Sequence, residues 1–293
     1  MSVRSGLVVV DKPGAMTSHD VVARVRRLAG TRKVGHAGTL DPMATGVLVV
    51  GVERATRLLG HLTLTEKAYD ATVRLGISTV TDDADGDELA RASAAHLAEA
   101  DVREALAGFV GDIAQVPTAV SAVKVDGRRA YQRVRAGEDV DLPARAVTVH
   151  ELVVHDIVHQ PGPDVVDVRL SLRCSSGTYV RAIARDLGAR LGVGGHLTAL
   201  RRTAVGPYGV DVAHTLDALA EDLVVLPLAD AARAAFRTFD LDEEQTQHVR
   251  FGRPLGLDLY GLTALFAPDG EFLALYGPKD GKARPVAVFV GAG

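Results

Sequence analysis

The chain has 293 residues, of which 47% are hydrophobic and 24% charged, and this composition suits a globular protein with a sizeable core. No apolar run approaches the roughly 20 residues that a membrane-spanning helix needs, and we expect no secretory signal because the opening stretch is soon interrupted. The single cysteine, Cys174, excludes an internal disulfide framework and favours a reducing, cytoplasmic compartment. A chain of this length forms one large domain, or a large domain with a small one.

The net charge is −4, but acidic and basic residues fall in separate stretches of the chain. The acidic stretches are 82–88, 221–223 and 240–244. The basic stretches are 24–33, 124–135 and 201–202. This separation permits a basic surface for a polyanion on a protein that is acidic as a whole. Solvated arginine faces without any ligand explain the same stretches equally well.

The first half of the chain predicts, in order, a strand at 6–13, a helix from Ser18 to Gly30, a buried strand at 45–52 and a short helix at 54–62. Ser18 is the expected N-cap of the first helix, and Gly30 is its expected stop. Next come an alternating strand at 67–77, an acidic loop at 82–88, a helix near 93–108 and an extended segment at 112–125.

The second half predicts a basic helix at 127–137, an antiparallel strand pair at 145–160 and 164–177, an amphipathic helix at 178–192 and a strand at 196–208. Because these elements do not repeat as βαβ units, we expect an α+β fold with a central mixed, mostly antiparallel sheet flanked by helices. A hairpin at 262–277 and a last strand at 283–290 predict a small β-rich C-terminal domain. The expected domains are therefore residues 1–232 and 233–293.

Several familiar chemistries lack support in the sequence. There is no phosphate-binding glycine loop. His150 and His155 have the wrong spacing for a zinc-protease helix, and the valines between them favour a strand. The acidic stretch 82–88 fails the spacing of a calcium-binding EF-hand loop, so we interpret it as a solvated loop. We expect neither a metal nor a cofactor.

The segment GHAGTLDPMATG, residues 35–46, places one carboxylate, Asp41, among small residues and before a proline. An aspartate in this position commonly caps the backbone of a turn. A catalytic carboxylate is the alternative. No second acid lies nearby in the sequence, which disfavours a local two-carboxylate glycosidase site. A partner acid from elsewhere in the chain remains open.

Six segments together resemble the successive motifs of bacterial TruB-type tRNA pseudouridine synthases. They are VVVDKPGAMTS (8–18), VGHAGTLDPMATGVLVVGVERATRLL (34–59), KAYDATVRLG (67–76), QVPTAVSAVKVDGRRAYQRVRAG (115–137), CSSGTYVRAIARDLG (174–188) and GGHLTALRRTAVGPY (194–208). The resemblance covers roughly residues 6–210, and the rest of the chain is similar to a PUA-type RNA-binding domain. One departure lies after Pro13, where the family pattern KP-x-G becomes Pro13, Gly14, Ala15.

The resemblance implies the pseudouridine synthase fold and an enzyme that isomerises uridine to pseudouridine at position 55, in the T loop of tRNA. It implies that the target base flips out of the loop, that no cofactor is needed, and that the tRNA T arm is the partner. We expect a monomer with no obligatory protein partner and no membrane association. An RNA chaperone that helps tRNA to fold is a second possibility. An aspartyl hydrolase is a third, but the motif regions lack its metal-binding acids.

The resemblance also implies roles for individual residues. Asp41 matches the catalytic carboxylate, Arg181 the arginine that pairs with it, and Tyr69 the tyrosine that stacks on the target base. Leu200 matches an apolar residue that lines the uracil pocket, although core packing explains a leucine there too. The matched residues that flip the base or support the site are His36, Lys12 and Tyr179.

Basic residues in the three basic stretches are candidates for contacts with the RNA backbone. They are Arg24, Arg27, Arg32, Lys33, Lys124, Arg128, Arg129, Arg201 and Arg202. We expect them to converge on one cleft, with the acidic stretches facing away from it.

Overall fold

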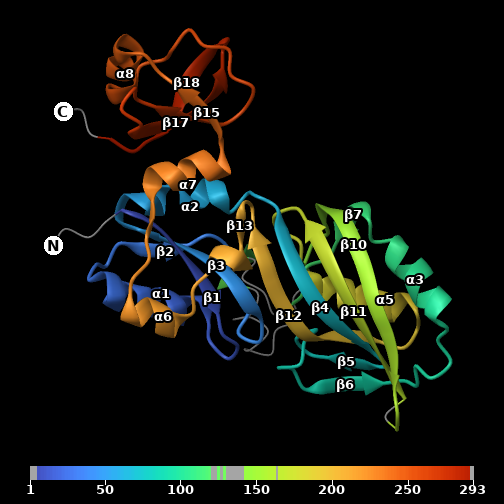
Figure 1. Cartoon of the computed structure of the whole chain (residues 1–293). Coiled ribbons are helices and arrows are strands. Elements are labelled where there is room, and N and C mark those ends of the chain that lie inside the picture. The colour runs from blue at the N-terminus through green and yellow to red at the C-terminus, as the bar shows by residue number, and fades with distance from the viewer. Residues whose placement is uncertain (1–4, 120–123, 126–127, 130–141, 163, 291–293) are drawn as a thin grey trace.

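The structure is a computed structural model that describes residues 5–119, 124–125, 128–129, 142–162 and 164–290. Within these residues a ten-stranded sheet forms the larger part of the molecule, and a four-stranded sheet forms the C-terminal part (Figure 1). Helices lie against the large sheet, and most strand pairs in it are antiparallel. The expected α+β class is therefore confirmed.

The large sheet has a continuous path of eight strands with two short strands beside it. The path runs β14 (Leu226–Pro227), β1 (Gly6–Lys12), β3 (Thr45–Val52), β12 (Gly195–Val205), β4 (Lys67–Leu75), β11 (Val165–Cys174), β10 (Arg145–Gln160) and β7 (Gly111–Gln115). The short strands are β2 (Val34–His36) beside β3 and β13 (Tyr208–Gly209) beside β12. β3 and β12 pair in parallel, and this pair joins the two halves of the sheet.

The remaining helices and short strands of the large domain are α1 (Ser18–Ala29), η1 (Glu53–Arg57), α2 (Leu59–Leu62), β5 (Ile77–Thr79), β6 (Glu88–Arg91), α3 (Glu99–Ala107), β8 (Lys124–Val125), β9 (Arg128–Arg129), α5 (Val180–Arg190), η2 (Val210–Val212) and α6 (Leu216–Glu221). Among them, the expected helices are present as α1, η1 with α2, α3 and α5, whereas β5, β6, η2 and α6 were not expected.

The helix expected at 127–137 is wrong at its start, because β9 pairs with β8 as an antiparallel hairpin. The Asp-Gly dipeptide at 126–127 is a sequence signal for a hairpin turn, and this signal was not used in the expectation. Residues 130–137 of the expected helix lie outside the described residues.

The first helix begins one residue earlier than expected. Thr17, not Ser18, is its N-cap: the Thr17 hydroxyl accepts from the backbone N–H of Asp20, and the Asp20 carboxylate accepts from the N–H of Thr17. This reciprocal pair is a capping box, which requires an acid or amide three residues after the cap. Gly30 ends the helix with a left-handed backbone, as expected.

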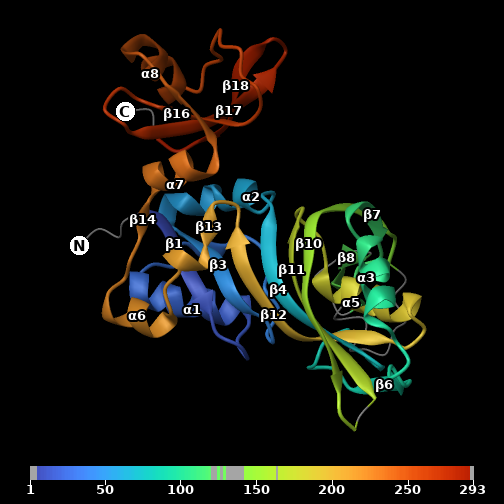
Figure 2. The ribbon, with the colours of Figure 1, turned by 45° about the vertical axis from the view of Figure 1, so that its right-hand side comes forward.

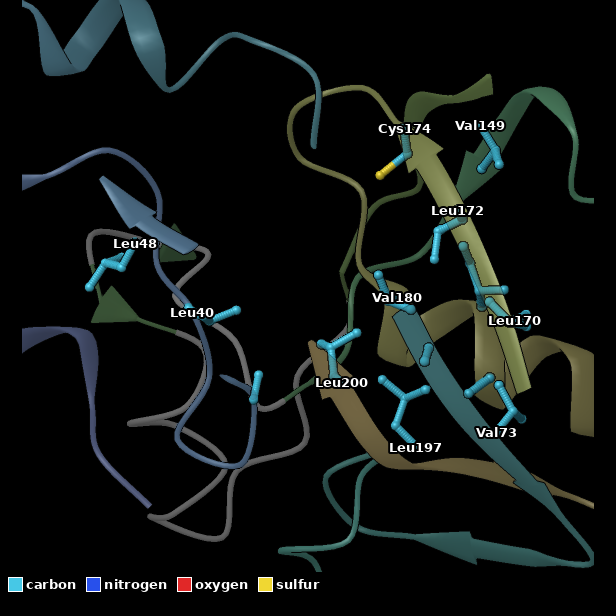
Figure 3. Close-up of a cluster of buried hydrophobic side chains, with 14 of the residues drawn as sticks. Leu40, Leu48, Val73, Val149, Leu170, Leu172, Cys174, Val180, Leu197 and Leu200 are labelled. Carbon is cyan, nitrogen blue, oxygen red and sulfur yellow. The ribbon is translucent and has the colours of Figure 1, made fainter. Parts of the chain in front are cut away.

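Alternation along β1 sends its side chains to two different cores. Val8 and Val10 belong to the first cluster, which packs beneath both α1 and α5. Leu7 and Val9 belong to the second cluster, on the opposite face. Figure 3 shows part of the first cluster, with the sheet on one side and the start of α5 on another. The same alternation directs Lys12 and Asp11, at the end of β1, to opposite faces.

The second cluster joins the C-terminal part to the large sheet. Phe266, Phe272 and Phe289 pack with residues of β1, β3 and α2. At the edge of this contact, Arg54 and Arg57 of η1 donate hydrogen bonds to backbone carbonyls near the end of the chain. Figures 1 and 2 both show α7 next to α2 at this junction.

The C-terminal sheet contains the expected hairpin and last strand. Its members are β15 (Arg237–Asp240), β16 (Thr263–Phe266), β17 (Phe272–Lys279) and β18 (Lys282–Val288). Two helices were not expected here: α7 (Leu228–Ala235) precedes the sheet, and α8 (Glu243–Arg250) packs on it. A capping box between Asp242 and Gln245 begins α8, which is the signal that predicts it.

None of the helices in the described part of the chain combines the length and the apolar character that crossing a membrane requires.

Ala15 has a backbone φ of 60°, in the left-handed region that favours glycine. It occupies the position at which the family pattern has glycine. The left-handed conformation costs an L-residue roughly 1–2 kcal/mol, and glycine avoids this cost. The greater entropy of glycine in the unfolded chain offsets part of the resulting stabilisation. We expect Ala15→Gly to raise the free energy of unfolding by about 1 kcal/mol, measured from the urea midpoint. The matched control is Ala23→Gly on the exposed face of α1, which should lower it by about the same amount. Equal losses in both variants would contradict strain at Ala15.

Candidate active site

Asp41 lies in the loop between β2 and β3, and buried side chains hold this loop at several points. Ser18 both accepts from the N–H and donates to the carbonyl of Leu40, at 2.9 Å each. The Lys12 ammonium, which is fully buried, donates to the carbonyls of Pro13, Met16 and Pro42. Lys12 therefore ties the turn after β1 to the residue that follows Asp41.

Arg202 holds both ends of the same loop. It is 1% exposed, and its three nitrogens donate to the carbonyls of Val47 at 2.7 Å, Thr39 at 3.1 Å and Gly38 at 3.2 Å. Gly46 must be glycine, because a Cβ there would lie 2.2 Å from the carbonyl oxygen of Arg202 and its φ is 98°. The glycines of this segment thus permit close backbone packing.

Arg181 lies in the first turn of α5 and is 5% exposed. Its Nε is 2.9 Å from Oδ2 of Asp41, and its Nη1 is 3.3 Å from Oδ2 of Asp83. The same Nη1 donates to the carbonyl of Thr81 at 2.8 Å. One buried guanidinium therefore joins two carboxylates, Asp41 and Asp83, that are 42 residues apart in the sequence.

The interpretation of residues 82–88 as a solvated loop is wrong for its first two acids. Asp83 is 4% exposed, and Asp82 lies 3.4 Å from Nη1 of Arg185. Burial raises the pKa of Asp82, and a hydrogen bond from Thr118 partly opposes that rise. Asp83 lies beside Arg181, a buried guanidinium that requires a counter-charge, and Asp82 pairs with the partly exposed Arg185. Asp83 was missed because nothing in the local sequence distinguishes it from its solvated neighbours.

Burial raises the pKa of Asp41 above the ordinary aspartate value of 3.8. The positive charge of Arg181 lowers it, the negative charge of Asp83 raises it, and Arg202 adds a smaller lowering effect. The guanidinium of Arg181 thus favours the ionised form of Asp41, against a net upward shift of its pKa. Its side chain is 32% exposed, so one edge of the carboxylate can meet a ligand.

Tyr69 and Leu200 lie on neighbouring strands next to this ion pair. Tyr69 of β4 is opposite Arg202 of β12, and its ring packs against the first hydrophobic cluster. Burial raises the pKa of the Tyr69 phenol, with the Arg202 charge opposing the rise. Leu200 is 7% exposed and belongs to the same cluster, where Figure 3 shows it with Leu40 and Val180. Leu200 therefore packs in the core beside the site.

His36 ends β2, just before the loop, and is half-buried. Its ring contacts that of His19 edge-on, with centroids 5.7 Å apart. Burial lowers the pKa of His36, and the charge of His19 lowers it further. Both rings lie where the chain enters the Asp41 loop.

Tyr179 is the N-cap residue of α5, but its side chain does not cap the helix. Instead, the buried amide of Gln115 accepts from the Tyr179 N–H at 2.8 Å and donates to its carbonyl at 3.1 Å. This clamp fixes the backbone two residues before Arg181. Gln115 was not identified as a site residue, although it opens one of the six motifs.

The expected set of RNA-backbone residues requires correction at 201–202. Arg202 is 1% exposed and donates to three backbone carbonyls, so it does not reach a phosphate at the surface. Arg201 points to the opposite face of β12 and pairs with Asp11 at 2.8 Å. The three basic stretches were expected to converge on one cleft. Residues 201–202 do not fit this expectation, because consecutive strand residues face opposite sides of the sheet.

The other basic candidates divide into two groups. On and after α1, Arg24 is half-exposed, and Arg27, Arg32 and Lys33 are exposed. Lys33 lies 3.6 Å from Glu53, in a surface pair that leaves its ammonium accessible. The side chains of the second group, Lys124, Arg128 and Arg129, lie outside the described residues.

Two further expectations concern metal ligands and the cysteine. Among the described residues, no group of three or more histidine, cysteine, aspartate or glutamate side chains is arranged to hold a metal ion. His150 and His155 lie on strand β10, as their valine-rich surroundings predict. Cys174 is buried in the first hydrophobic cluster, and burial raises the pKa of its thiol to about 11.

Comparison with known proteins agrees with the motif resemblance. The model of the TruB family pseudouridylate synthase N-terminal domain matches residues 26–180. The tRNA pseudouridylate synthase B C-terminal domain matches residues 181–233, and the tRNA pseudouridine synthase II C-terminal domain matches residues 236–290.

Curated relatives match over nearly the whole chain. A tRNA pseudouridine synthase B of Thermobifida fusca is 59% identical, covering 98% of this chain and 99% of its own. One from Streptomyces griseus is 55% identical, covering 97% of each. Among solved structures, one chain of a Cbf5–Nop10–Gar1 complex is similar to this chain, with a TM-score of 0.75 and 25% sequence identity. The match covers 99% of this chain and 86% of that chain.

An α+β sheet that carries a carboxylate paired with an arginine, together with relatives named tRNA pseudouridine synthase B, defines the class of protein: an isomerase of the pseudouridine synthase fold. The chain belongs to the TruB family of pseudouridylate synthases.

The ion-pair geometry predicts opposite stability effects for its two partners. Arg181→Met leaves two buried acids facing each other, so it should lower the free energy of unfolding by about 3–5 kcal/mol. Asp41→Asn removes a buried charge while Asp83 still neutralises Arg181, so it should leave stability unchanged or raise it. Urea unfolding at pH 7 measures both.

The raised pKa of Asp41 in the Asp41–Arg181 ion pair also makes the free energy of unfolding depend on pH. Because the pKa of Asp41 is raised on folding, its protonated form favours the folded state below pH 3.8, and this contribution is lost as pH rises through the raised value. The stability advantage of Asp41→Asn over the unsubstituted protein should therefore grow with pH across that range. An advantage that shrinks as pH rises would contradict the assigned direction.

Proposed function

We propose that this protein isomerises uridine to pseudouridine in tRNA, at position 55 of the T loop, with Asp41 as its catalytic residue. The single observation that carries the proposal is the partly exposed carboxylate of Asp41 held 2.9 Å from the buried guanidinium of Arg181. The tRNA substrate is supported by relatives with more than half of their residues identical, which are named tRNA pseudouridine synthase B.

The reaction breaks the N1–C1′ bond, turns the base, and forms a C5–C1′ bond. The proton on C5 leaves, and N1 takes up a proton, so atoms and electrons balance without a redox step. A carboxylate can serve here as a nucleophile or as a base. Burial beside Arg181 suits it to either role, because the guanidinium stabilises the ionised form in a site with little water.

Tyr69 and His36 complete the site for an everted base. Tyr69, on β4, lies close enough to Asp41 for the two side chains to interact electrostatically, and stacking of its ring on a base is worth about 1–3 kcal/mol. His36 lies at the entrance of the Asp41 loop, where an imidazole can occupy the space that the flipped base leaves. Arg24, Arg27, Arg32 and Lys33 supply exposed positive charge for backbone phosphates along α1.

We further propose that residues 1–232 form the catalytic domain and residues 233–293 a PUA-like RNA-binding domain. In support, the small sheet begins at Arg237, and the family matches change between residues 233 and 236. We place the protein in the cytoplasm as a monomer. The buried, unpaired thiol of Cys174 suits a reducing compartment.

Asp41→Asn tests the assignment of the catalytic residue. We expect tritium release from a T-arm stem-loop labelled at C5 of the target uridine to fall by about 10³-fold or more, because Asp83, the other acid on Arg181, is only 4% exposed and cannot replace Asp41. Binding of the stem-loop, measured by filter retention, should stay within about threefold. Release at the normal rate would refute the role of Asp41, and a protein that binds but never releases tritium, even unsubstituted, would be a chaperone instead.

Two substitutions separate the contribution of the Tyr69 ring to the reaction rate from that of its hydroxyl. If stacking is its main role, Tyr69→Phe keeps most of the activity, whereas Tyr69→Ala loses the roughly 1–3 kcal/mol of stacking, or about 5- to 150-fold in rate. Single-turnover tritium release compares the two. Equal losses would assign the main role to the phenol hydroxyl.

A further inference from the structure

The consecutive arginines Arg201 and Arg202 of β12 point to opposite faces of the sheet. Arg201 is partly exposed, and Arg202 is buried. Arg201 pairs with Asp11 on the face of the second hydrophobic cluster. Arg202 points to the face of the first cluster and is among the largest fully buried side chains of the described residues. A buried guanidinium must be completely hydrogen-bonded to be tolerated, so its partners indicate what it does.

The three carbonyls that accept from Arg202 belong to the Asp41 loop or to its exit, and its guanidinium is also hydrogen-bonded to the Tyr69 phenol. Nη1 and Nη2 donate to Thr39 and Gly38, at the start of the loop, and Nε donates to Val47, just after its end. Asp41 lies between these anchors. A planar guanidinium can hold three carbonyls in one fixed arrangement, whereas an ammonium offers a single point of attachment.

The backbone of Arg202 adds a second link to the loop. It pairs in parallel with Gly46, where no Cβ would fit, and on its other side it pairs with Tyr69. The residue thus stands between the loop that carries Asp41 and the strand that carries Tyr69. Both groups change position if Arg202 moves.

We propose that Arg202 is a positioning residue that fixes the distance and orientation of Asp41 relative to Tyr69 and makes no contact with RNA. The part of this inference that concerns reaction rate rests on the proposed function. The part that concerns loop order does not, so the two can fail separately.

Arg202→Lys and Arg202→Met separate the hydrogen-bonded fork from the charge. Both lose the threefold attachment, so both should slow single-turnover tritium release at saturating enzyme by about 10²-fold, the scale of a 1 Å misplacement of a reacting group. The half-saturating enzyme concentration should change by less than about twofold, since no RNA contact is lost. Arg74→Met is the matched control: it removes a bidentate arginine of the same sheet, paired with Asp167 and remote from the loop, and should leave the rate within about threefold.

The pH profile distinguishes positioning from charge. The groups that act on Asp41 are Arg181, Asp83 and Arg202, and Lys12 is close enough to respond to Asp41 in turn. Removing the positive charge in Arg202→Met raises the pKa of Asp41, so the acid limb of the rate should move to higher pH. Arg202→Lys keeps the charge, so its acid limb should stay in place while the rate falls.

Amide hydrogen exchange supplies a readout that needs no activity. Exchange at residues 38–46 should accelerate in Arg202→Lys, while α1 and β10 keep the protection of the unsubstituted protein. Loss of activity in the unsubstituted protein would refute the proposed function and leave this readout intact.

Three outcomes would overturn the positioning role. The first is an Arg202→Lys rate within about threefold of the unsubstituted protein. The second is a half-saturating concentration that rises in step with the rate loss, which would make Arg202 an RNA contact. The third is an Arg202→Lys protein that does not fold, because the side chain would then support the whole core and not the loop.

Discussion

One buried guanidinium, shared between Asp41 and Asp83, is the constraint on which the site depends. Burial raises the pKa of Asp41, and the negative charge of Asp83 raises it further. Arg181 opposes both effects from a single position at the start of α5, although the net shift of the Asp41 pKa is upward. The arrangement therefore leaves a partly exposed carboxylate whose protonation depends on the balance between one guanidinium and a second acid.

Three segments that are remote in the sequence hold the Asp41 loop and the start of α5 in place around the Arg181 guanidinium. α1 contributes Ser18, which fixes the loop before Asp41, and β7 contributes Gln115, which fixes the start of α5. The parallel pair of β3 and β12 brings the loop against Arg202. Each anchor is a buried polar group with its hydrogen bonds satisfied, which is the form of interaction that specifies one geometry instead of many. The C-terminal part is held to the back of the same sheet by a separate apolar cluster.

Much of this architecture was predictable from local pattern. A β-rich stretch ending at a proline located the strand around Val8, the turn PGPD located the strand pair that includes Leu170, and glycine at position 30 marked the end of α1. The family resemblance pointed to Asp41, Arg181 and Tyr69, which the fold brings together. The rest depended on distant contacts: Asp83 looks like any solvated acid until Arg181 is placed beside it, and Arg202 looks like a phosphate ligand until the pleat of β12 turns it inward. Local sequence carries no information on which side of a sheet a loop will close.

The most direct test of the shared guanidinium is a carbon-13 NMR titration of the Asp41 carboxyl in the unsubstituted protein and in Asp83→Asn. We predict a midpoint above the ordinary value of 3.8 in the first, and a lower midpoint in the second, because a like charge is removed while Arg181 stays. A midpoint at or below 3.8 in the unsubstituted protein that Asp83→Asn leaves unchanged would show that the two acids do not share the arginine, and would contradict the account.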